Sequence, residues 1–458
     1  MKVIICGAGQ VGFNIARQLA RERNDVIVID QSTDLVRRVN ELLDVQGMVG
    51  HASHPDMLEA ADASSADMII AVTHTDEVNM IACQVAHSLF EVPTKIARVR
   101  NQNYLQAMWA NLFARDNLPI DVTISPEIEV ARAISRRLDV PGASDMMPFA
   151  DDRVRVISVL TDNSCPIVDT PLRQLTELFS GLSIRVLGIL RDQLILTPSG
   201  DEFINAGDEV YFAADADHVR RAMAAFGHEE REARRVIVVG GGNIGFYLAE
   251  LLESEHPSVN VKIIESSRER AEVAADRLGQ AIVLNGDALD REILREANIE
   301  ATETFVAVTN DDQVNVLACL LAKRHGCQRT IALVNNMSYS QLVVSLGVDV
   351  VVSPRATTVS TILQHVRRGR IIKVHSVHDG RAEIIEGEAL ETSPLVGMAL
   401  RESQIPRGII VGALLRKNEV IIPRGDTVIE AGDRVIVFAA ANMVTKVEQI
   451  FSVRSDYF

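Results

Sequence analysis

The chain repeats itself, and this internal duplication limits the folds that it can adopt. The segment Val72–Ala86 aligns with Val308–Ala322, and eight of the fifteen aligned positions are identical. The offset is 236 residues here, 233 at the glycine motifs described below, and 225 between Gly207-Asp208 and Gly432-Asp433. An offset that drifts this slowly indicates two homologous halves that differ by a few short insertions. The second half must therefore repeat the architecture of the first.

Each half begins with short runs of β-branched residues separated by helical patterns. Strand, helix, strand at this spacing predicts a doubly wound parallel sheet, so we expect an α/β fold with two tandem Rossmann-like domains. The strands expected in the first half are Val3–Cys6, Val26–Ile29, Val45–Val49, Met68–Val72, Thr94–Val99 and Ile120–Ile124. Those expected in the second half are Val236–Val239, Val261–Ile264, Ala281–Leu284, Thr304–Val308, Thr330–Val334 and Val348–Val352.

The remainder of each half has a different, strand-rich pattern that predicts a small α+β domain. In the first half we expect strands at Val154–Leu160, Gly181–Leu190, Leu194–Thr197 and Glu209–Ala213. We match to them, in the same order, Ile371–Val377, Ile409–Leu415, Val420–Ile422 and Arg434–Phe438 of the second half. Gly-Asp pairs mark the turns between these strands: Gly200-Asp201, Gly207-Asp208, Gly425-Asp426 and Gly432-Asp433.

Two Ser-Pro pairs and one charged stretch suggest the domain boundaries. Ser125-Pro126 and Ser353-Pro354 each offer a serine N-cap followed by proline at the first helical position. Residues 228–235 are polar and charged, which is typical of a linker. We therefore predict sheet domains at 1–124 and 236–352, helices at 125–140 and 353–369, small domains at 141–227 and 370–458, and a linker at 228–235.

A G-x-G-x-x-G motif follows the first expected strand and opens a helix. Gly7 allows the tight turn, Gly9 lets the backbone approach a pyrophosphate, and Gly12 lets helix and strand pack closely. The free N–H groups at the helix start would bind phosphate oxygens. Asp30 ends the second strand, where a carboxylate accepts hydrogen bonds from ribose hydroxyls. This combination predicts a dinucleotide or adenine-nucleotide site in the first half.

The second half carries a related motif with a different environment. Gly240-Gly-Gly-Asn-Ile-Gly245 again lies between a strand and a helix, and Glu265 follows twenty residues after Gly245. Arg98, on the fifth strand, could pair with a phosphate, but Leu333 occupies the matching position. The alternative for Arg98 is a solvent-exposed strand charge. We therefore expect a second nucleotide site that holds its ligand differently or more weakly.

Composition excludes several classes of function. The 46 basic and 62 acidic side chains give a net charge of −16, and the chain has one Trp, so we do not expect nucleic-acid binding. We find neither an apolar run of about eighteen residues, which a membrane span would need, nor the features of a signal peptide. Five scattered cysteines predict a protein of a reducing compartment.

Three groups of residues have both a functional and a structural interpretation. His51 and His54 could form a metal pair, but no second ligand cluster accompanies them and a surface loop is favoured. Asp311-Asp312 could bind a cation, but loop carboxylates or caps of the next helix are favoured. His74 could be a general base, but hydrogen bonding within a turn is favoured. Because a dehydrogenase needs an acid–base group near the nicotinamide, and none is evident, we predict a sensor and not an enzyme.

The order of a nucleotide-binding domain and a small domain, present twice, resembles the RCK family (regulators of potassium conductance). The resemblance extends from Met1 to about residue 454, and its most specific parts are Lys2–Gly12, the repeated Val-Thr-x-x-Asp-x-Val-Asn and Ile96–Arg100. It implies a cytoplasmic regulatory subunit, a homotetramer, bound at the inner face of the cell membrane to a potassium channel-like transporter subunit. It also implies that the helices opening at Ser125 and Ser353 exchange contacts between neighbouring domains.

The resemblance further implies NAD(H), ATP and ADP as ligands and names their contacts. The first set is Gly7, Ala8, Gly9, Gln10, Val11, Asp30, Thr73, His74 and Arg98, with NAD(H) as the expected cofactor. The second set is Gly240, Gly242, Asn243, Ile244, Glu265 and Thr309, with ATP or ADP as the expected ligand. Two alternatives stay open: an NAD-dependent oxidoreductase with a duplicated Rossmann fold, and a regulator of a potassium/proton antiporter.

Overall fold

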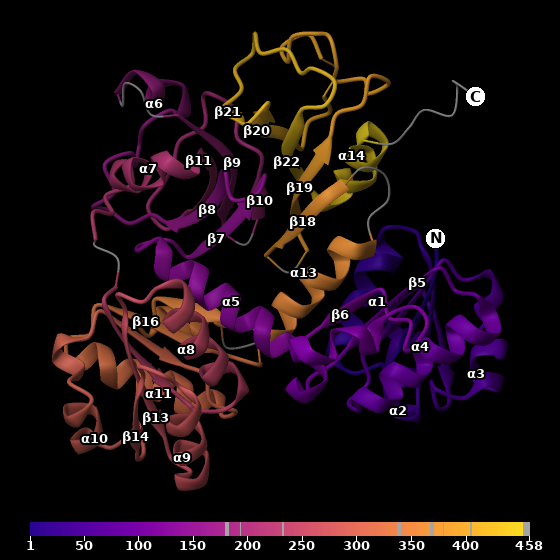
Figure 1. The fold of residues 1–458 in the computed structure, drawn as a ribbon. Helices are drawn as coiled ribbons and strands as arrows, with labels where there is room; N and C mark the ends of the chain where they lie inside the picture. Colours follow the sequence, from indigo (N-terminus) through magenta and orange to yellow (C-terminus); the bar gives the residue numbers. More distant parts are fainter. Residues whose placement is uncertain are drawn as a thin grey trace. The chain divides into compact units, whose positions relative to one another are not determined.

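The chain folds into two compact units, each built from segments that are distant in the sequence. The computed structural model describes residues 1–178, 183–192, 194–230, 233–336, 340–366, 371–378, 380–403 and 405–451. The first unit comprises Met1–Val130 and Pro354–Val366, and the second comprises Ala131–Ser353 and Arg367–Phe458 (Figure 1). No helix within the described ranges is both long enough and apolar enough to cross a bilayer.

The first unit contains a six-stranded parallel sheet in the order β3-β2-β1-β4-β5-β6. Ligands bind in such sheets where the strand order reverses, which here is between β1 and β4. The strands are β1 (Lys2–Cys6), β2 (Asp25–Asp30), β3 (Gln46–Val49), β4 (Met68–Ala71), β5 (Thr94–Arg98) and β6 (Val122–Ile124). The helices are α1 (Gln10–Arg21), α2 (Thr33–Leu42), α3 (Pro55–Ala60) and α4 (Asp76–Phe90).

Helix α13 (Pro354–Val366) comes from the second half of the sequence but packs within the first unit. Its buried residues Ile362, Leu363 and Val366 share one core with Ile5 and Ile15. Figure 1 shows α13 beside α1 and β6. Helix α13 thus contributes to the core of a sheet domain that precedes it by more than 200 residues in the sequence.

The second unit contains the repeated parallel sheet, in the order β14-β13-β12-β15-β16-β17. All strands that the sequence predicted for the two parallel sheets are therefore present. These strands are β12 (Arg235–Val239), β13 (Asn260–Glu265), β14 (Ile282–Asn285), β15 (Thr304–Ala307), β16 (Arg329–Leu333) and β17 (Val350–Val352). The helices are α8 (Asn243–Glu255), α9 (Arg268–Arg277), α10 (Arg291–Glu296), α11 (Asp312–Arg324) and α12 (Ser340–Ser345).

Helix α5 (Pro126–Asp139) ends in the second unit, where a partly buried arginine holds its C-terminal end. Arg329 donates to the carbonyl oxygens of Arg137 (2.7 Å) and Ala143 (2.5 Å). Burial, more than any other factor, lowers the pKa of Arg329 to about 10. The carbonyl groups at the end of a helix carry partial negative charge and lack helical partners, so they compensate this partly buried cation.

Each small domain is a five-stranded antiparallel sheet, in the orders β10-β9-β11-β8-β7 and β18-β19-β22-β20-β21. The first contains β7 (Asp145–Phe149), β8 (Val154–Leu160), β9 (Ile184–Arg191), β10 (Leu194–Leu196), β11 (Glu209–Asp215), α6 (Leu172–Leu178) and α7 (Val219–Ala225). The second contains β18 (Ile371–Val377), β19 (Ala382–Glu388), β20 (Ile409–Arg416), β21 (Glu419–Ile421), β22 (Arg434–Ala440) and α14 (Val444–Phe451). Residues 181–182, where the sequence placed the start of β9, lie outside the described residues.

One match between the two small domains was wrong. The sequence matched Val154–Leu160 to Ile371–Val377. In the two sheets, however, β8 occupies the position that corresponds to β19, and β7 the position that corresponds to β18. Neither β7 nor β19 was predicted, because β7 contains Pro148 and β19 contains three glutamates and a glycine, all of which disfavour strands. An edge strand tolerates Pro148, and β7 lies at the edge of its sheet.

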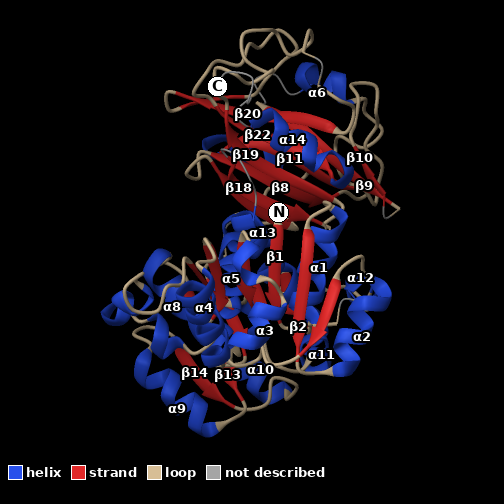
Figure 2. Cartoon of the chain, turned by 90° about the vertical axis from the view of Figure 1, so that its right-hand side faces the viewer, coloured by secondary structure: helices blue, strands red, loops and turns tan. Residues whose placement is uncertain are grey.

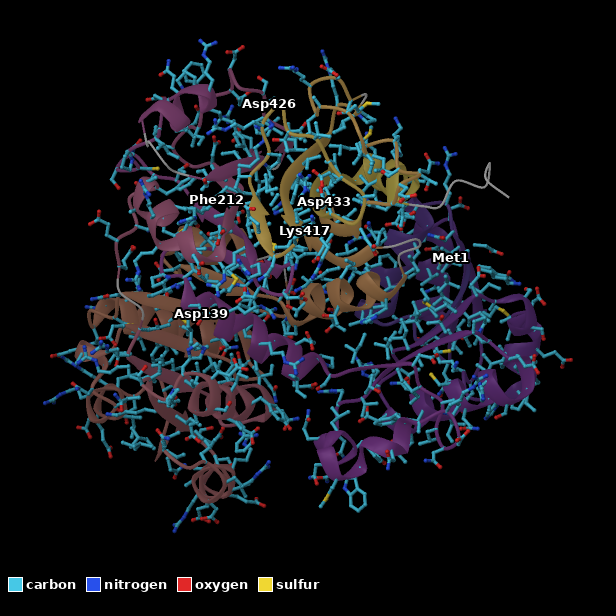
Figure 3. All side chains as sticks on the ribbon, turned by 45° about the horizontal axis from the view of Figure 1, so that its top comes forward. Met1, Asp139, Phe212, Lys417, Asp426 and Asp433 are labelled. Carbon is cyan, nitrogen blue, oxygen red and sulfur yellow. The ribbon has the colours of Figure 1, made fainter. Side chains whose placement is uncertain are left out.

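The two small domains of the second unit share one apolar core. Phe149, Leu187 and Tyr211 of the first pack with Ile384 and Phe438 of the second. Figure 2 shows the strands of both domains lying together. Buried residues of the first domain such as Phe212, and buried residues of the second such as Asp433, are labelled in Figure 3.

Candidate functional site

The first glycine motif forms an open loop at the start of α1. Gly7 has a φ of +112°, which favours glycine, and its N–H donates to the carbonyl of Ile29 (2.7 Å). Gly9 is the N-cap of α1, and no side chain caps the helix there. A Cβ atom added to Gly9 would meet nothing within 4 Å. The loop therefore leaves space and N–H groups for a phosphate next to the helix start, where Gln10 and Val11 begin α1.

Asp30 ties this loop to the end of β2. Its carboxylate accepts hydrogen bonds from the N–H of Ala8 (2.6 Å) and of Ser32 (2.8 Å). The side chain is only partly buried, so its remaining lone pairs face outward. The structure thus brings Gly7–Val11 and Asp30 together, as the sequence predicted.

The ends of β4 and β5 are joined by an asparagine that the sequence analysis did not single out. Asn79 is fully buried in α4, and its Oδ1 accepts from the N–H (2.8 Å) and the hydroxyl (2.7 Å) of Thr73. Its Nδ2 donates to the carbonyl oxygens of Thr73 (3.2 Å) and Arg98 (2.9 Å). Asn79 therefore fixes both strand ends beside the glycine loop. Its identical place in the two repeated segments was the signal that could have revealed it.

Arg98 is not an exposed strand charge. Its Nη2 donates to the carbonyl of Thr73 (2.6 Å), while its Nε is buried and has no hydrogen-bond partner among the described residues. Burial is the main cause of the lowered pKa of this guanidinium. A buried donor without a partner is costly, so the position of this guanidinium carries a desolvation cost.

The three histidines that the sequence singled out, His51, His54 and His74, lie outside helices and strands. His74 is exposed, and the hydrogen bonds that hold its turn come from Thr73 and Asn79. The rings of His51 and His54 stack with centroids 4.5 Å apart, and His51 Nδ1 lies 2.8 Å from the hydroxyl of Ser53. Across the described ranges, no three His, Cys, Asp or Glu side chains form a group that could hold a metal ion.

The second glycine motif repeats the geometry of the first. Gly240 has a φ of +100°, and its N–H donates to the carbonyl of Ile264 (2.9 Å). Gly242 is the N-cap of α8, no side chain caps that helix, and an added Cβ would meet nothing within 4 Å. Asn243 and Ile244 form the first helical residues. The second half thus provides the same open space for a phosphate.

The strand ends beside the second motif are fixed in the same way. Asn315 Oδ1 accepts from the N–H (2.8 Å) and hydroxyl (2.7 Å) of Thr309, and its Nδ2 donates to the carbonyl of Leu333 (2.9 Å). Asp311 caps α11 by accepting from Gln313 N–H (2.8 Å), which confirms the capping interpretation. A cavity of about 400 Å³ opens here, lined by Gly240, Gly242, Glu265, Arg270, Asp287 and Thr309, among others.

Glu265 differs from Asp30 in its burial and in its partners. It is 3% exposed and accepts from the N–H of Gly241 (2.7 Å) and of Ser267 (2.8 Å), and from the guanidinium of Arg270 (2.8 Å). Burial opposes ionisation of Glu265, but these hydrogen bonds outweigh it and lower its pKa. The sequence analysis missed Arg270. The signal that could have revealed it is the difference between the halves, because the first half has Leu35 at the matching position.

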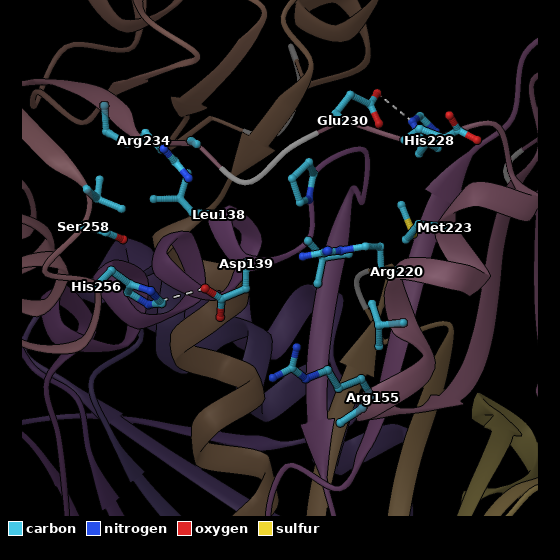
Figure 4. A pocket seen from close by; sticks show the side chains of 18 of the residues that line it. Leu138, Asp139, Arg155, Arg220, Met223, His228, Glu230, Arg234, His256 and Ser258 are labelled. Atoms are coloured by element: carbon cyan, nitrogen blue, oxygen red, sulfur yellow. Dashed lines mark hydrogen bonds and ion pairs between the residues drawn. The ribbon is translucent and has the colours of Figure 1, made fainter.

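A larger cavity of about 780 Å³ in the second unit contains none of the predicted site residues. It lies along the predicted linker, and Figure 4 shows its charged side chains. Four of them form two pairs: His256 Nε2 lies 3.4 Å from Asp139, and His228 Nδ1 lies 3.0 Å from Glu230 on the same segment. Side chains of both signs of charge line this cavity.

Comparisons with known proteins assign the family. Residues 3–126 and 236–354 match the TrkA-N domain, and residues 156–227 and 385–452 match the TrkA-C domain. The chain is 52% identical over 458 residues to the Trk system potassium uptake protein TrkA of Azorhizobium caulinodans, with 100% of both chains covered. The chain belongs to the TrkA family. The TrkA of Halomonas elongata is 43% identical over 462 residues, again with 100% of both chains covered.

Solved structures share the fold of this TrkA-family chain. The GsuK RCK domain superposes with a TM-score of 0.59 at 16% identity, covering 99% of this chain and 95% of that chain. The GsuK channel bound to NAD gives a TM-score of 0.59 at 16% identity, covering 99% of this chain and 79% of that chain. The two parallel-sheet domains, each followed by an antiparallel sheet, are thus the architecture of RCK proteins, as the resemblance implied.

We expect Gly9→Val to remove nucleotide binding from the first site and to leave the fold intact. The valine side chain fits the free protein, since nothing lies within 4 Å of its Cβ, but it fills the space next to the helix start. The loss of two charged hydrogen bonds of about 1.5 kcal/mol each weakens binding by about two orders of magnitude. Calorimetric titration with NADH and with ATP measures this loss. Gly242→Val is the matched control, and undiminished affinity in both variants would contradict the assignment.

Proposed function

We propose that this chain is a regulatory subunit that binds NAD(H) and the adenine nucleotides ATP and ADP, and that it gates a membrane potassium uptake protein of the TrkH/TrkG type. The observation that carries the proposal is the full-length similarity to proteins named Trk system potassium uptake protein TrkA, at 52% and 43% identity. In this proposal the chain works as a homotetramer at the cytoplasmic face of the membrane and has no catalytic activity of its own.

The two glycine loops support nucleotide binding. Each places an open glycine at the N-terminus of a helix, where N–H groups and the helix dipole favour phosphate. In the first site we assign the phosphates to Gly9, Gln10 and Val11, and a ribose hydroxyl to Asp30. Arg98, at the end of β5, would pair with a phosphate of the ligand through its guanidinium.

The contacts of the first site offer a route from the ligand to the rest of the chain. A ligand shifts a conformational equilibrium only through its different affinity for the two states. A phosphate at the start of α1 would act on the helix against which α13 packs. In the sequence, α13 is the last element of the first unit before β18, the first strand of the second small domain.

The direct test is potassium flux through the membrane partner reconstituted in vesicles, with and without this chain. We expect flux to require the chain and to change when NADH, NAD, ATP and ADP are exchanged, and we expect Gly9→Val to remove part of that response. Flux that ignores both the chain and the nucleotides would overturn the proposal. Turnover of NADH with small carbonyl compounds would support an oxidoreductase instead, and proton-coupled potassium efflux would support an antiporter regulator.

A further inference from the structure

The two nucleotide sites differ in charge at the ribose end. The fifth residue after the strand-terminal acid is Leu35 in the first half and Arg270 in the second. Leu35 is partly buried and packs against the core of the first unit. The guanidinium of Arg270 instead contacts Glu265 Oε1 through Nη2 (2.8 Å) and Nε (3.2 Å). Asp30 has no such cation among its described hydrogen-bond partners.

The contact with Glu265 leaves much of Arg270 available to a ligand. Its side chain is 55% exposed, whereas that of Glu265 is 3% exposed. Arg270 lines the 400 Å³ cavity together with Gly242 and Ser266. A guanidinium carries five N–H donors, and the contacts with Glu265 use two of its nitrogens. The Glu265–Arg270 pair is therefore neutral overall and still presents donors, while Asp30 in the first site keeps its charge without a paired cation among its described hydrogen-bond partners.

This difference bears on the phosphorylation state of the ribose. In Rossmann-like sites the strand-terminal acid accepts from the ribose 2′-hydroxyl, and a nearby arginine accommodates a 2′-phosphate. An unpaired carboxylate repels that phosphate, whereas a carboxylate already paired with arginine does not impose its full charge. The first site has the acid alone, and the second has the acid and the arginine.

We propose that Arg270 lets the second site bind an adenosine that is phosphorylated on its ribose, as in a 2′-phosphorylated dinucleotide, while the first site selects the unmodified ribose. This inference rests on the proposed nucleotide binding. Asp287 and Asp311 also line the second cavity, where they accept from Leu289 N–H (2.9 Å) and Gln313 N–H (2.8 Å). The first half has His51 and Thr75 at these positions. The negative charges of Asp287 and Asp311 oppose binding of an anionic ligand. The preference for a phosphorylated ribose therefore depends on Arg270, whose positive charge must offset that repulsion.

The test compares 5′-AMP with adenosine 2′,5′-bisphosphate, which differ only in the 2′-phosphate. Full-length Gly9→Val protein leaves the second site to be titrated, and Gly242→Val protein leaves the first. We expect the bisphosphate to bind the second site at least as tightly as AMP, and to bind the first about tenfold more weakly than AMP. In the Gly9→Val protein, the further change Arg270→Leu should weaken the bisphosphate about tenfold and change AMP binding less than about threefold.

Matched variants separate recognition from structural support. Arg268→Leu removes a neighbouring arginine that is 84% exposed and pairs with Glu272, and it should leave both affinities unchanged. Arg270→Lys should retain part of the preference, because it keeps the charge. Equal weakening of both ligands by Arg270→Leu would overturn the inference, since it would mean that Arg270 only orders the loop through Glu265. Failure of Gly9→Val protein to bind either ligand would instead refute nucleotide binding at the second site.

Discussion

Gly12→Ala is expected to destabilise the first unit by at least about 3 kcal/mol, an effect at the upper end for overpacking. The Cβ atom of an alanine at this position would lie 1.8 Å from the carbonyl oxygen of Gly7. The contact is with backbone and not with a flexible side chain, so either α1 or the turn at Gly7 must move. Both are fixed: α1 buries Ile15 and Leu19, and Gly7 is bonded to Ile29.

Hydrogen exchange measures this loss better than a single melting curve, because a chain with two compact units need not unfold in one step. Amides of β1 and α1 should lose protection, while those of the second unit keep it. Gly9→Ala is the matched control, since its Cβ meets nothing within 4 Å and the fold should be unaffected. Gly245→Ala should move the effect to the second sheet, where its Cβ would lie 1.9 Å from Gly240 O. Full protection of β1 in Gly12→Ala would contradict the expectation.

The parallel sheets could be predicted from the sequence because their strands are buried on both faces. Runs such as Val3–Cys6 and Val236–Val239 are continuous and apolar, and they recur between helical patterns. The small domains gave a weaker signal. Strand β19 contains Glu383, Glu386 and Glu388, and its assignment depends on tertiary partners: Glu386 accepts from Arg434 (2.6 Å) and from Ala150 N–H (3.0 Å). No local pattern contains those partners.

The candidate site divides in the same way. The glycine loops and the acids Asp30 and Glu265 follow from spacing, because a Rossmann turn needs them at fixed positions. The roles of Asn79 and Arg270 do not, since each depends on a hydrogen bond to a residue on another element. The duplication contained a signal for both. Asn79 is repeated as Asn315, which indicates a shared structural need, and Arg270 replaces Leu35, which indicates a difference between the sites.

Placement of α13 is a further property that sequence periodicity could not determine. An amphipathic helix needs an apolar surface, but its pattern does not say which sheet supplies that surface. Ile362, Leu363 and Val366 would suit either half, and in the structure they join the core that contains Ile5. Only the family resemblance implied such an exchange. The helix that adds residues of the second half to the core of the first unit is therefore the element least accessible to local analysis.

Asp433→Ala is expected to destabilise the second small domain by about 1–3 kcal/mol, the usual cost of leaving a buried hydrogen-bonding group without its partner. Asp433 is 2% exposed and accepts from Arg416 Nε (2.9 Å), from Arg416 Nη2 (2.7 Å) and from the N–H of Glu430 (2.8 Å). The first small domain repeats this arrangement with Asp208 and Arg191, at 2.9 Å and 2.8 Å. The hydrogen bond to Asp433 is the main cause of the raised pKa of Arg416.

Removal of this carboxylate leaves Arg416 Nε and the N–H of Glu430 without their acceptor, whereas the guanidinium keeps Glu430 Oε1 (2.6 Å) and the carbonyl of Val428 (2.7 Å). Hydrogen exchange of β20 and β22 in the full chain should report the loss, together with faster proteolysis of this domain. Asp426→Ala is the control: Asp426 lies in an exposed turn of the same domain, and its change should stay within about 0.5 kcal/mol. Asp433→Asn should fall between the two, because it keeps the shape and one acceptor oxygen but removes the charge. If the amides of β20 and β22 were equally protected from exchange in the Asp433→Ala and Asp426→Ala proteins, the Asp433–Arg416 pair would not be needed for stability. Its repetition as Asp208–Arg191 would then need a functional and not a structural explanation.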